Sequence, residues 1–202
     1  MIQEAVREIF RREAEAIANI PITDAFEKAV ELIRVHVHER RGKLITTGMG
    51  KAGQIALNMA TTFSSTGTAA VYLHPSEAQH GDLGVVQDDD VMLMISNSGK
   101  TREIIELIDL VRRLVPSIPL IVITGNGESE LAQASDACLL TGNPKEVCAL
   151  GLTPTTSTTV MTVIGDALVV TLMRRINFSN ADYAKRHHGG YLGDKSRKQA
   201  GM

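Results

Sequence analysis

Three hydroxyl residues within six positions carry the strongest chemical signal in this sequence. Ser96, Ser98 and Thr101 lie between an apolar run, 91–95, and an amphipathic segment, 101–115. The run is typical of a buried strand and the segment of a helix, so the loop joins a strand's carboxyl end to a helix's amino end. Ligands of α/β sheets bind there, and free N–H groups and the helix dipole favour an anion. The pattern predicts a phosphate pocket.

Two other interpretations of this loop need consideration. Ser98 or Lys100 could simply start the helix, with Gly99 making the turn. Gly99-Lys100-Thr101 also resembles the end of a nucleotide P-loop, but that motif needs a glycine where this chain has Met94. We therefore exclude the P-loop and keep the helix start as the alternative.

A second glycine-rich turn follows the first expected strand. Gly48, Gly50 and Gly53 match the spacing of a dinucleotide fingerprint, but no acidic residue ends the second strand, which reads Leu-His-Pro. We expect these glycines to admit a phosphate or a sugar instead. Lys51 would then point into the crevice; alternatively, it is a solvated lysine at a helix start.

Candidate acid–base groups follow further along the chain. Glu103 falls in the first turn of a predicted helix, where the dipole alone would favour a carboxylate. Glu146 lies in a long loop, 142–155, and His187 lies in a glycine-bounded segment. Carboxylates and imidazoles are the usual general acids and bases of enzymes.

Several classes of protein are excluded by composition and spacing. The net charge is −2 and aromatic residues make up 3%, which argues against nucleic-acid binding. His74 and His80 do not form a His-Glu-x-x-His site, and no Gly-x-Ser-x-Gly elbow occurs. Cys138 and Cys148 lack zinc spacing, so reduced thiols in the cytoplasm are expected. We also expect no signal peptide and no membrane span.

The order of elements predicts an α/β protein. Strands are expected over 43–47, 69–73, 90–95, 119–124 and 137–141, with helices between them. This alternation favours a parallel sheet covered on both faces. Two leading helices, 2–18 and 24–39, would add a layer that serves as a subunit contact or covers the sheet. We divide the chain into a helical extension, 1–40, a catalytic domain, 41–195, and a flexible tail, 196–202, with loose order expected after Gly193.

Taken together, the motifs resemble the sugar isomerase (SIS) domain family. They are Gly48-Met-Gly-Lys-x-Gly, Ser96-Asn-Ser-Gly-x-Thr-x-Glu and a threonine-rich helix start. Further segments beginning at Thr66, His74, Lys145 and His187 are similar to those of arabinose-5-phosphate isomerases. The resemblance covers about residues 40–195 and implies a single three-layer domain with a five-stranded parallel sheet.

This resemblance implies interconversion of D-arabinose 5-phosphate and D-ribulose 5-phosphate through an enediol, which feeds synthesis of Kdo, a lipopolysaccharide sugar. The family's catalytic positions fall on Lys51, Glu103, Glu146 and His187. Its substrate contacts fall on Gly50, Gly67, Thr68, His80, Ser96, Asn97, Ser98 and Thr101. Either glutamate could be the carbon base, and His188 is the alternative to His187.

The resemblance also implies partners and cofactors. No cofactor is required in the family, and inhibitory zinc is associated with the position of His74. Members of the family are homotetramers in which residues of one subunit complete the site of a neighbour. For a form that lacks CBS domains, the resemblance extends to inhibition by the end product CMP-Kdo. Many carry CBS domains, so we expect this chain to be a stand-alone form. A phosphosugar-binding regulatory module and an isomerase of another sugar phosphate are the alternatives.

Overall fold

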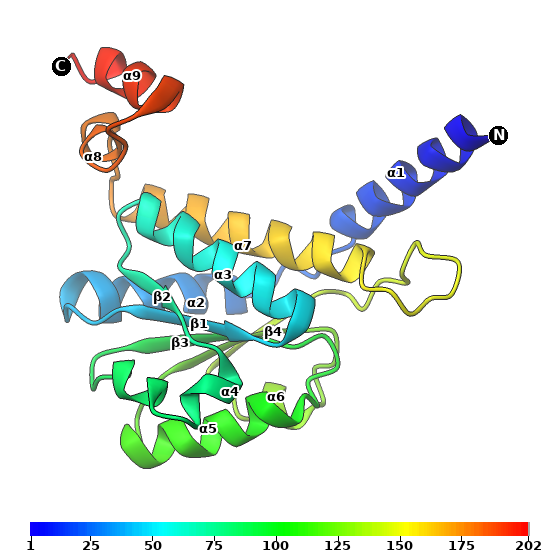
Figure 1. The fold of residues 1–202 in the computed structure, drawn as a ribbon, viewed down its shortest axis with the longest axis horizontal. Helices are drawn as coiled ribbons and strands as arrows, with labels where there is room; N and C mark the ends of the chain where they lie inside the picture. The colour runs from blue at the N-terminus through cyan, green and yellow to red at the C-terminus, as the bar shows by residue number, and fades with distance from the viewer. Residues whose placement is uncertain (202) are drawn as a thin grey trace.

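Five parallel strands form the centre of the protein, in the order β2-β1-β3-β4-β5. A computed structural model describes residues 1–201 (Figure 1). The strands are β1 (Leu44–Gly48), β2 (Ala70–Tyr72), β3 (Val91–Ile95), β4 (Leu120–Thr124) and β5 (Ala137–Leu140). Each lies within about two residues of the strand expected from the apolar runs, and the predicted five-stranded parallel sheet is confirmed.

The sheet has a hydrophobic core on each face because both faces are covered. In β3, Leu93 and Ile95 belong to one buried cluster, whereas Met92 and Met94 belong to the other. Successive side chains of a strand point to opposite faces, so a strand covered on both sides must be apolar throughout. This explains the unbroken apolar run in the sequence.

Helices on the two faces differ in length. The first face carries α2 (Ala25–Ile33), α3 (Gly50–Ser65) and α7 (Thr156–Arg175), whose buried residues belong to one cluster (Figure 1). The second face carries α4 (Pro75–Ala78), α5 (Arg102–Leu114) and α6 (Glu130–Gln133). A π-helical turn, Arg34–Glu39, extends α2, and a 3-10 turn, Asp82–Val85, follows α4.

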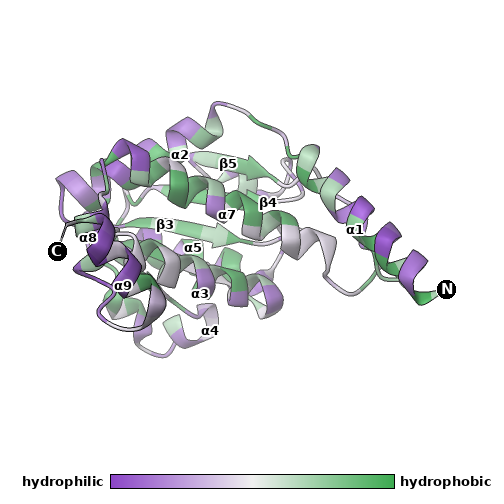
Figure 2. Ribbon diagram, turned by 90° about the horizontal axis from the view of Figure 1, so that it is seen from above, coloured by the Kyte–Doolittle hydropathy of each residue, from purple (hydrophilic) through white to green (hydrophobic). Residues whose placement is uncertain are grey.

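The two leading helices do not behave alike. α2 is part of the core, with Ala29 and Ile33 fully buried. α1 (Ile2–Ala18) has no buried residue and projects away from the sheet (Figure 1). Figure 2 shows apolar and polar residues alternating along α1, and Phe10 of its apolar stripe is 69% exposed. In this chain α1 is therefore not a cover for the sheet.

α7 is long and apolar enough to cross a membrane by length and composition, with a mean hydropathy of 1.5. Half of that window is buried inside the protein. Val160, Ile164 and Leu168 of α7 lie in the core on the first face. The hydropathy of α7 is therefore that of a core helix. Within residues 1–201, α7 is the one helix that meets the length and hydropathy criteria for a membrane span.

The chain ends in two helices, α8 (Asn180–Ala184) and α9 (Gly190–Gln199). The expectation of loose order after Gly193 is wrong for the described part of this segment. Gly193 is buried in α9, and glycine is required there because a Cβ atom would collide with the carbonyl oxygen of His187. The residues of α9 are mostly polar, so hydrophobic periodicity did not indicate a helix there.

Leu93→Ala should destabilise the protein by about 2–5 kcal/mol, because Leu93 is fully buried in the central strand and its loss leaves a cavity. Urea unfolding followed by circular dichroism measures this. Leu150→Ala, at a residue that is 77% exposed, is the matched control and should change the free energy of unfolding by less than about 0.5 kcal/mol. Equal losses for the two variants would contradict this account of the core.

Candidate active site

A cavity of about 1020 Å³ lies at the carboxyl edge of the sheet. The loops after β1, β3, β4 and β5 contribute to it, together with α1 and the start of α7. The polar residues that line it are Arg12, Lys51, Ser96, Asn97, Ser98, Lys100, Thr101, Asn126, Asn143, Lys145, Glu146, Ser157 and Thr158. Four of these side chains are cationic, so the cavity suits an anionic ligand.

The hydroxyl loop after β3 borders this cavity as the sequence predicts. Ser96 and Thr101 share a hydrogen bond of 2.7 Å between their hydroxyl oxygens, and Ser98 Oγ accepts one from the N–H of Lys100. α5 begins only at Arg102, and no side chain caps it. The helix start therefore does not depend on Ser98, and the first N–H groups of α5 have no side-chain acceptor within residues 1–201.

Gly99 gives the hydroxyl loop its shape. Its φ is +63°, a conformation that disfavours residues with a Cβ atom. A Cβ there would also lie 2.0 Å from Ser129 Oγ. The loop thus turns tightly against α6, which is why glycine follows Ser98.

The glycines of the first turn have two different roles. A Cβ at Gly48 or Gly53 would collide with neighbouring backbone, so these two allow α3 to pack closely on β1. Gly50 has a φ of +57° and open space around it, so it is the one of the three that faces outward. Beside it, Lys51 lines both the main cavity and an adjoining one of about 720 Å³. α3, like α5, has no side-chain cap.

Glu146 is bound to the start of α7. Its Oε2 accepts hydrogen bonds from the N–H of Thr155 at 2.6 Å and from the hydroxyl of Thr155 at 2.8 Å. The hydroxyl of Ser157 donates to Oε1, and the N–H of Ser157 lies 3.4 Å from Oε2. The hydroxyl cluster that opens this helix therefore binds a carboxylate of the same chain.

These contacts determine the ionisation of Glu146. Burial would raise the pKa of its carboxyl group, but hydrogen bonds from Ser157 and Thr155 outweigh burial and hold the pKa below its usual value. Glu146 is therefore a carboxylate at neutral pH. Oε2 accepts three hydrogen bonds but Oε1 accepts only one, so Oε1 keeps an acceptor position that a reacting proton could use.

Other candidate residues lie near this edge of the sheet but outside the cavity. Glu103 is half-buried in the first turn of α5. His74 follows β2 and accepts a hydrogen bond from the N–H of Ser76, while His80 is exposed beyond α4. Residues 1–201 contain no group of three metal-ligating side chains. His74 alone does not fit a zinc ion.

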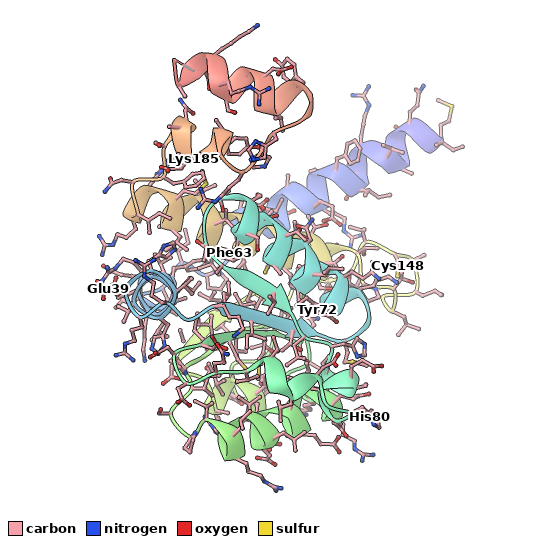
Figure 3. The ribbon with its side chains drawn as sticks, turned by 60° about the vertical axis from the view of Figure 1, so that its left-hand side comes forward. Glu39, Phe63, Tyr72, His80, Cys148 and Lys185 are labelled. Carbon is pink, nitrogen blue, oxygen red and sulfur yellow. The ribbon has the colours of Figure 1, made fainter. Side chains whose placement is uncertain are left out.

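Three further candidates, Gly67, Thr68 and His187, lie at the other end of the molecule. Glu146 contacts the amino end of α7 and His187 follows its carboxyl end; a helix of 20 residues is about 30 Å long. Figure 3 shows Cys148 and Lys185, which lie near Glu146 and His187 in the sequence, on different sides of the molecule. Gly67 lies against Phe178, and the hydroxyl of Thr68 contacts His38. One chain does not bring the two groups together.

The ring of His187 is held in a defined orientation. It stacks on Tyr183 at 3.7 Å between ring centroids, and its Nδ1 lies 3.1 Å from the carbonyl oxygen of Tyr183. A carbonyl oxygen only accepts, so Nδ1 carries the proton of the neutral ring. Nε2 is then the basic nitrogen, free to take a proton from a ligand.

Sequence reasoning missed several residues that line the cavity. Asn126 and Asn143 follow β4 and β5, and Lys145 precedes Glu146. Their position just after expected strands was a signal that could have identified them. Arg12 comes from α1, 134 positions from its partner Glu146, and no local pattern indicated it.

Comparisons with known proteins agree with this fold. The model of the SIS domain matches residues 37–171. The chain belongs to the SIS domain family. The arabinose 5-phosphate isomerase KdsD of Escherichia coli K12 is 45% identical over 195 residues, which is 96% of this chain and 58% of that protein. This chain thus spans little more than half the length of the curated relatives it matches.

Two solved structures are similar over nearly the whole chain. One, from Bacteroides fragilis NCTC 9343, is a candidate phosphosugar isomerase involved in capsule formation. It is 63% identical with a TM-score of 0.93, covering 95% of this chain and 100% of that one. The other, from Escherichia coli CFT073, was solved in complex with A5P; it is 33% identical with a TM-score of 0.85, covering 92% and 97%.

Gly99→Ala should weaken the binding of a sugar phosphate offered as a test ligand about tenfold or more, because strain at a positive φ costs about 1–3 kcal/mol and the loop must shift. Isothermal titration calorimetry measures the dissociation constant. Gly84→Ala is the control, since a Cβ at Gly84 meets nothing within 4 Å. Unchanged affinity in Gly99→Ala would show that the ligand does not use this loop.

Ser157→Ala should raise the pKa of Glu146 toward its usual value, because the variant loses a hydrogen bond that favours the carboxylate. A lowered pKa stabilises the fold at neutral pH, and this contribution disappears as the pH falls through the folded-state pKa. The variant should therefore lose stability near neutral pH and little in strong acid. Carbon-13 NMR titration of the carboxyl groups measures the shift; an unmoved Glu146 signal would contradict the assignment.

Proposed function

We propose that this protein is an aldose–ketose isomerase that interconverts D-arabinose 5-phosphate and D-ribulose 5-phosphate. One observation carries the proposal: a hydroxyl loop, two helix amino ends without side-chain caps, a lysine and an ionised glutamate share one cavity. The similarity to a structure in complex with A5P supports the choice of substrate. The substrate of the curated relatives points the same way.

The phosphate would bind at the hydroxyl loop. Ser96, Ser98 and Thr101 can donate hydrogen bonds, and the first N–H groups of α5 lie beside them. Asn97, on the same loop, would contact the sugar. Lys100 adds a positive charge, Lys51 of α3 lines the same cavity, and Gly50 would contact the substrate from the adjoining one.

The chemistry would proceed through an enediol. A base removes the proton from C2 of the aldose, the electron pair forms the C1–C2 double bond, and the aldehyde oxygen becomes an enediolate oxygen. The proton then returns from the base to C1, the C2 hydroxyl becomes the ketone, and its proton is transferred to the enediolate oxygen on C1. Lys51 would stabilise the negative oxygen, and His187 would open the sugar ring or move protons between the oxygens.

Either Glu146 or Glu103 would be the base at carbon. Glu146 lines the cavity, which favours it. Its low pKa makes it a weak base until a ligand displaces Ser157 or Thr155, since each lost donor raises its basicity. Glu103, half-buried on α5, would need a substrate that reaches past the hydroxyl loop.

The proposed site would need more than one chain. Gly67, Thr68 and His187 lie too far from Lys51 to serve the same substrate, so a second copy would supply them, within a tetramer. His80 would contact the substrate from the loop after α4. The enzyme would act in the cytoplasm at the first step of Kdo synthesis, with CMP-Kdo as an inhibitor. The mechanism uses side chains and no cofactor; inhibitory zinc at His74 would require ligands from elsewhere.

The purified protein should convert arabinose 5-phosphate faster than other pentose and hexose phosphates in a panel assay. In deuterated water, deuterium should appear at C2 of the recovered aldose, as an enediol requires.

Glu146→Gln should lower kcat about 10²–10⁴-fold if Glu146 is the base, whereas exposed Glu128→Gln should not. Activity should survive exhaustive chelation.

Three outcomes would contradict the proposal. Binding without turnover would favour a regulatory module, and faster turnover of another sugar phosphate would change the substrate. Loss of activity on chelation, without deuterium exchange, would favour a hydride shift assisted by a metal. Normal turnover by Glu146→Gln would move the base to Glu103.

A further inference from the structure

We propose that Arg12 of α1 is a positioning residue for Glu146, an inference that rests on the proposed function. α1 is otherwise weakly attached: it has no buried residue and carries exposed apolar side chains. Its polar side chains nevertheless reach the candidate site. A helix that projects from the fold therefore has a direct contact with the loop that bears the carboxylate.

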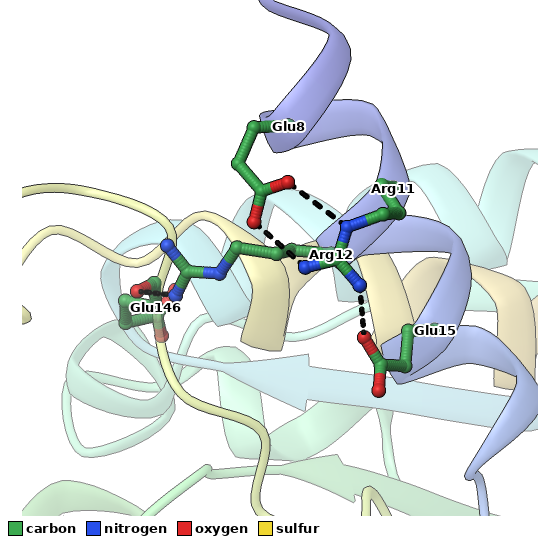
Figure 4. Close-up of polar contacts among 5 residues, drawn as sticks. All are labelled: Glu8, Arg11, Arg12, Glu15 and Glu146. Carbon is green, nitrogen blue, oxygen red and sulfur yellow. Dashed lines mark hydrogen bonds and ion pairs between the residues drawn. The ribbon is translucent and has the colours of Figure 1, made fainter. Parts of the chain in front are cut away.

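Arg12 holds the backbone of this loop. Its Nη2 donates a hydrogen bond of 3.0 Å to the carbonyl oxygen of Glu146, and its side chain lines the cavity (Figure 4). The bond is to the main chain, while the carboxylate of Glu146 is bound by Thr155 and Ser157. Arg12 therefore positions the main chain of Glu146, whereas Thr155 and Ser157 bind its carboxylate.

Glu13, the next residue, holds the other side of the same junction. Its Oε1 accepts a hydrogen bond of 2.8 Å from the hydroxyl of Thr156. The oxygen of that hydroxyl in turn accepts a bond of 3.1 Å from the N–H of Val147. Arg12 directly, and Glu13 through Thr156, thus hold the carbonyl oxygen and the N–H of the peptide group that joins Glu146 to Val147, and α1 ties this loop to α7.

Arg11 provides a comparison within the same helix. Its guanidinium binds Glu8 and Glu15, both on α1, and makes no contact with the loop (Figure 4). Its side chain is 63% exposed. Replacing Arg11 in one variant and Arg12 in another therefore makes the same chemical change, and only the Arg12 variant loses the contact with Glu146.

Arg12→Met should lower kcat for arabinose 5-phosphate about 10- to 100-fold, since small misplacement of a catalytic group has effects of this size. KM should change less than threefold, because the hydroxyl loop that binds phosphate is untouched. Arg12→Lys, which keeps the charge and donors, should recover part of the rate. Arg11→Met should stay within twofold of the parent in both constants.

A double-mutant cycle tests whether Arg12 acts through Glu146. Single-turnover rates at high enzyme concentration should show that Arg12→Met costs much less in a Glu146→Gln background than in the parent chain. Equal, multiplicative losses would overturn the inference, as would equal effects of Arg11→Met and Arg12→Met or a pure rise in KM.

The outcomes separate this inference from the proposed function. If the parent protein isomerises no sugar phosphate, the proposed function fails and this inference fails with it. If the parent is active and Glu146→Gln is impaired, but Arg12→Met matches Arg11→Met, only the role of Arg12 is refuted. Thermal unfolding of each variant identifies any loss of activity that comes from misfolding. If Arg12→Met misfolds, the rate of Arg12→Lys tests the role of Arg12 in its place.

Discussion

The bond between the carboxylate of Glu146 and the amino end of α7 holds the candidate site together. α7 is buried in the core, so a residue tied to its first turn is fixed relative to the sheet. A negative charge at this end also satisfies free N–H groups and interacts favourably with the helix dipole. The long loop after β5 thereby has a defined place at the cavity although it has no regular structure.

Three of the helices that start at this edge of the sheet, α3, α5 and α7, differ in what their amino ends bind. α7 carries its own carboxylate, whereas α3 and α5 start without a side-chain cap and have Lys51 and Lys100 beside them. Cations at a helix amino end are unfavourable unless an anion is bound. Of these three helix ends, one is thus bound by a carboxylate of the same chain, and the other two, with lysines beside them, have no side-chain cap. This distribution of charge agrees with a sugar phosphate.

Much of this arrangement could be predicted. The run 91–95 is apolar throughout because the strand is covered on both faces, and the hydroxyl loop follows it directly. The threonine-rich segment was recognised as a helix start, but only the structure shows that Thr155 and Ser157 donate to Glu146. Capping the helix, binding a ligand and binding Glu146 would each satisfy the same donors, so nothing local distinguishes these roles. α9 was missed because its polar composition has no apolar period.

The sequence by itself determined the strands, the order of helices and the identity of the hydroxyl loop, because these depend on neighbours within a few residues. Only the tertiary structure decided that Arg12 reaches Glu146, and that His187 lies a helix length away from it. Such relations depend on the path of the whole chain, since folding can bring together or keep apart residues that are distant in the sequence, and hydrophobic periodicity carries no record of that path.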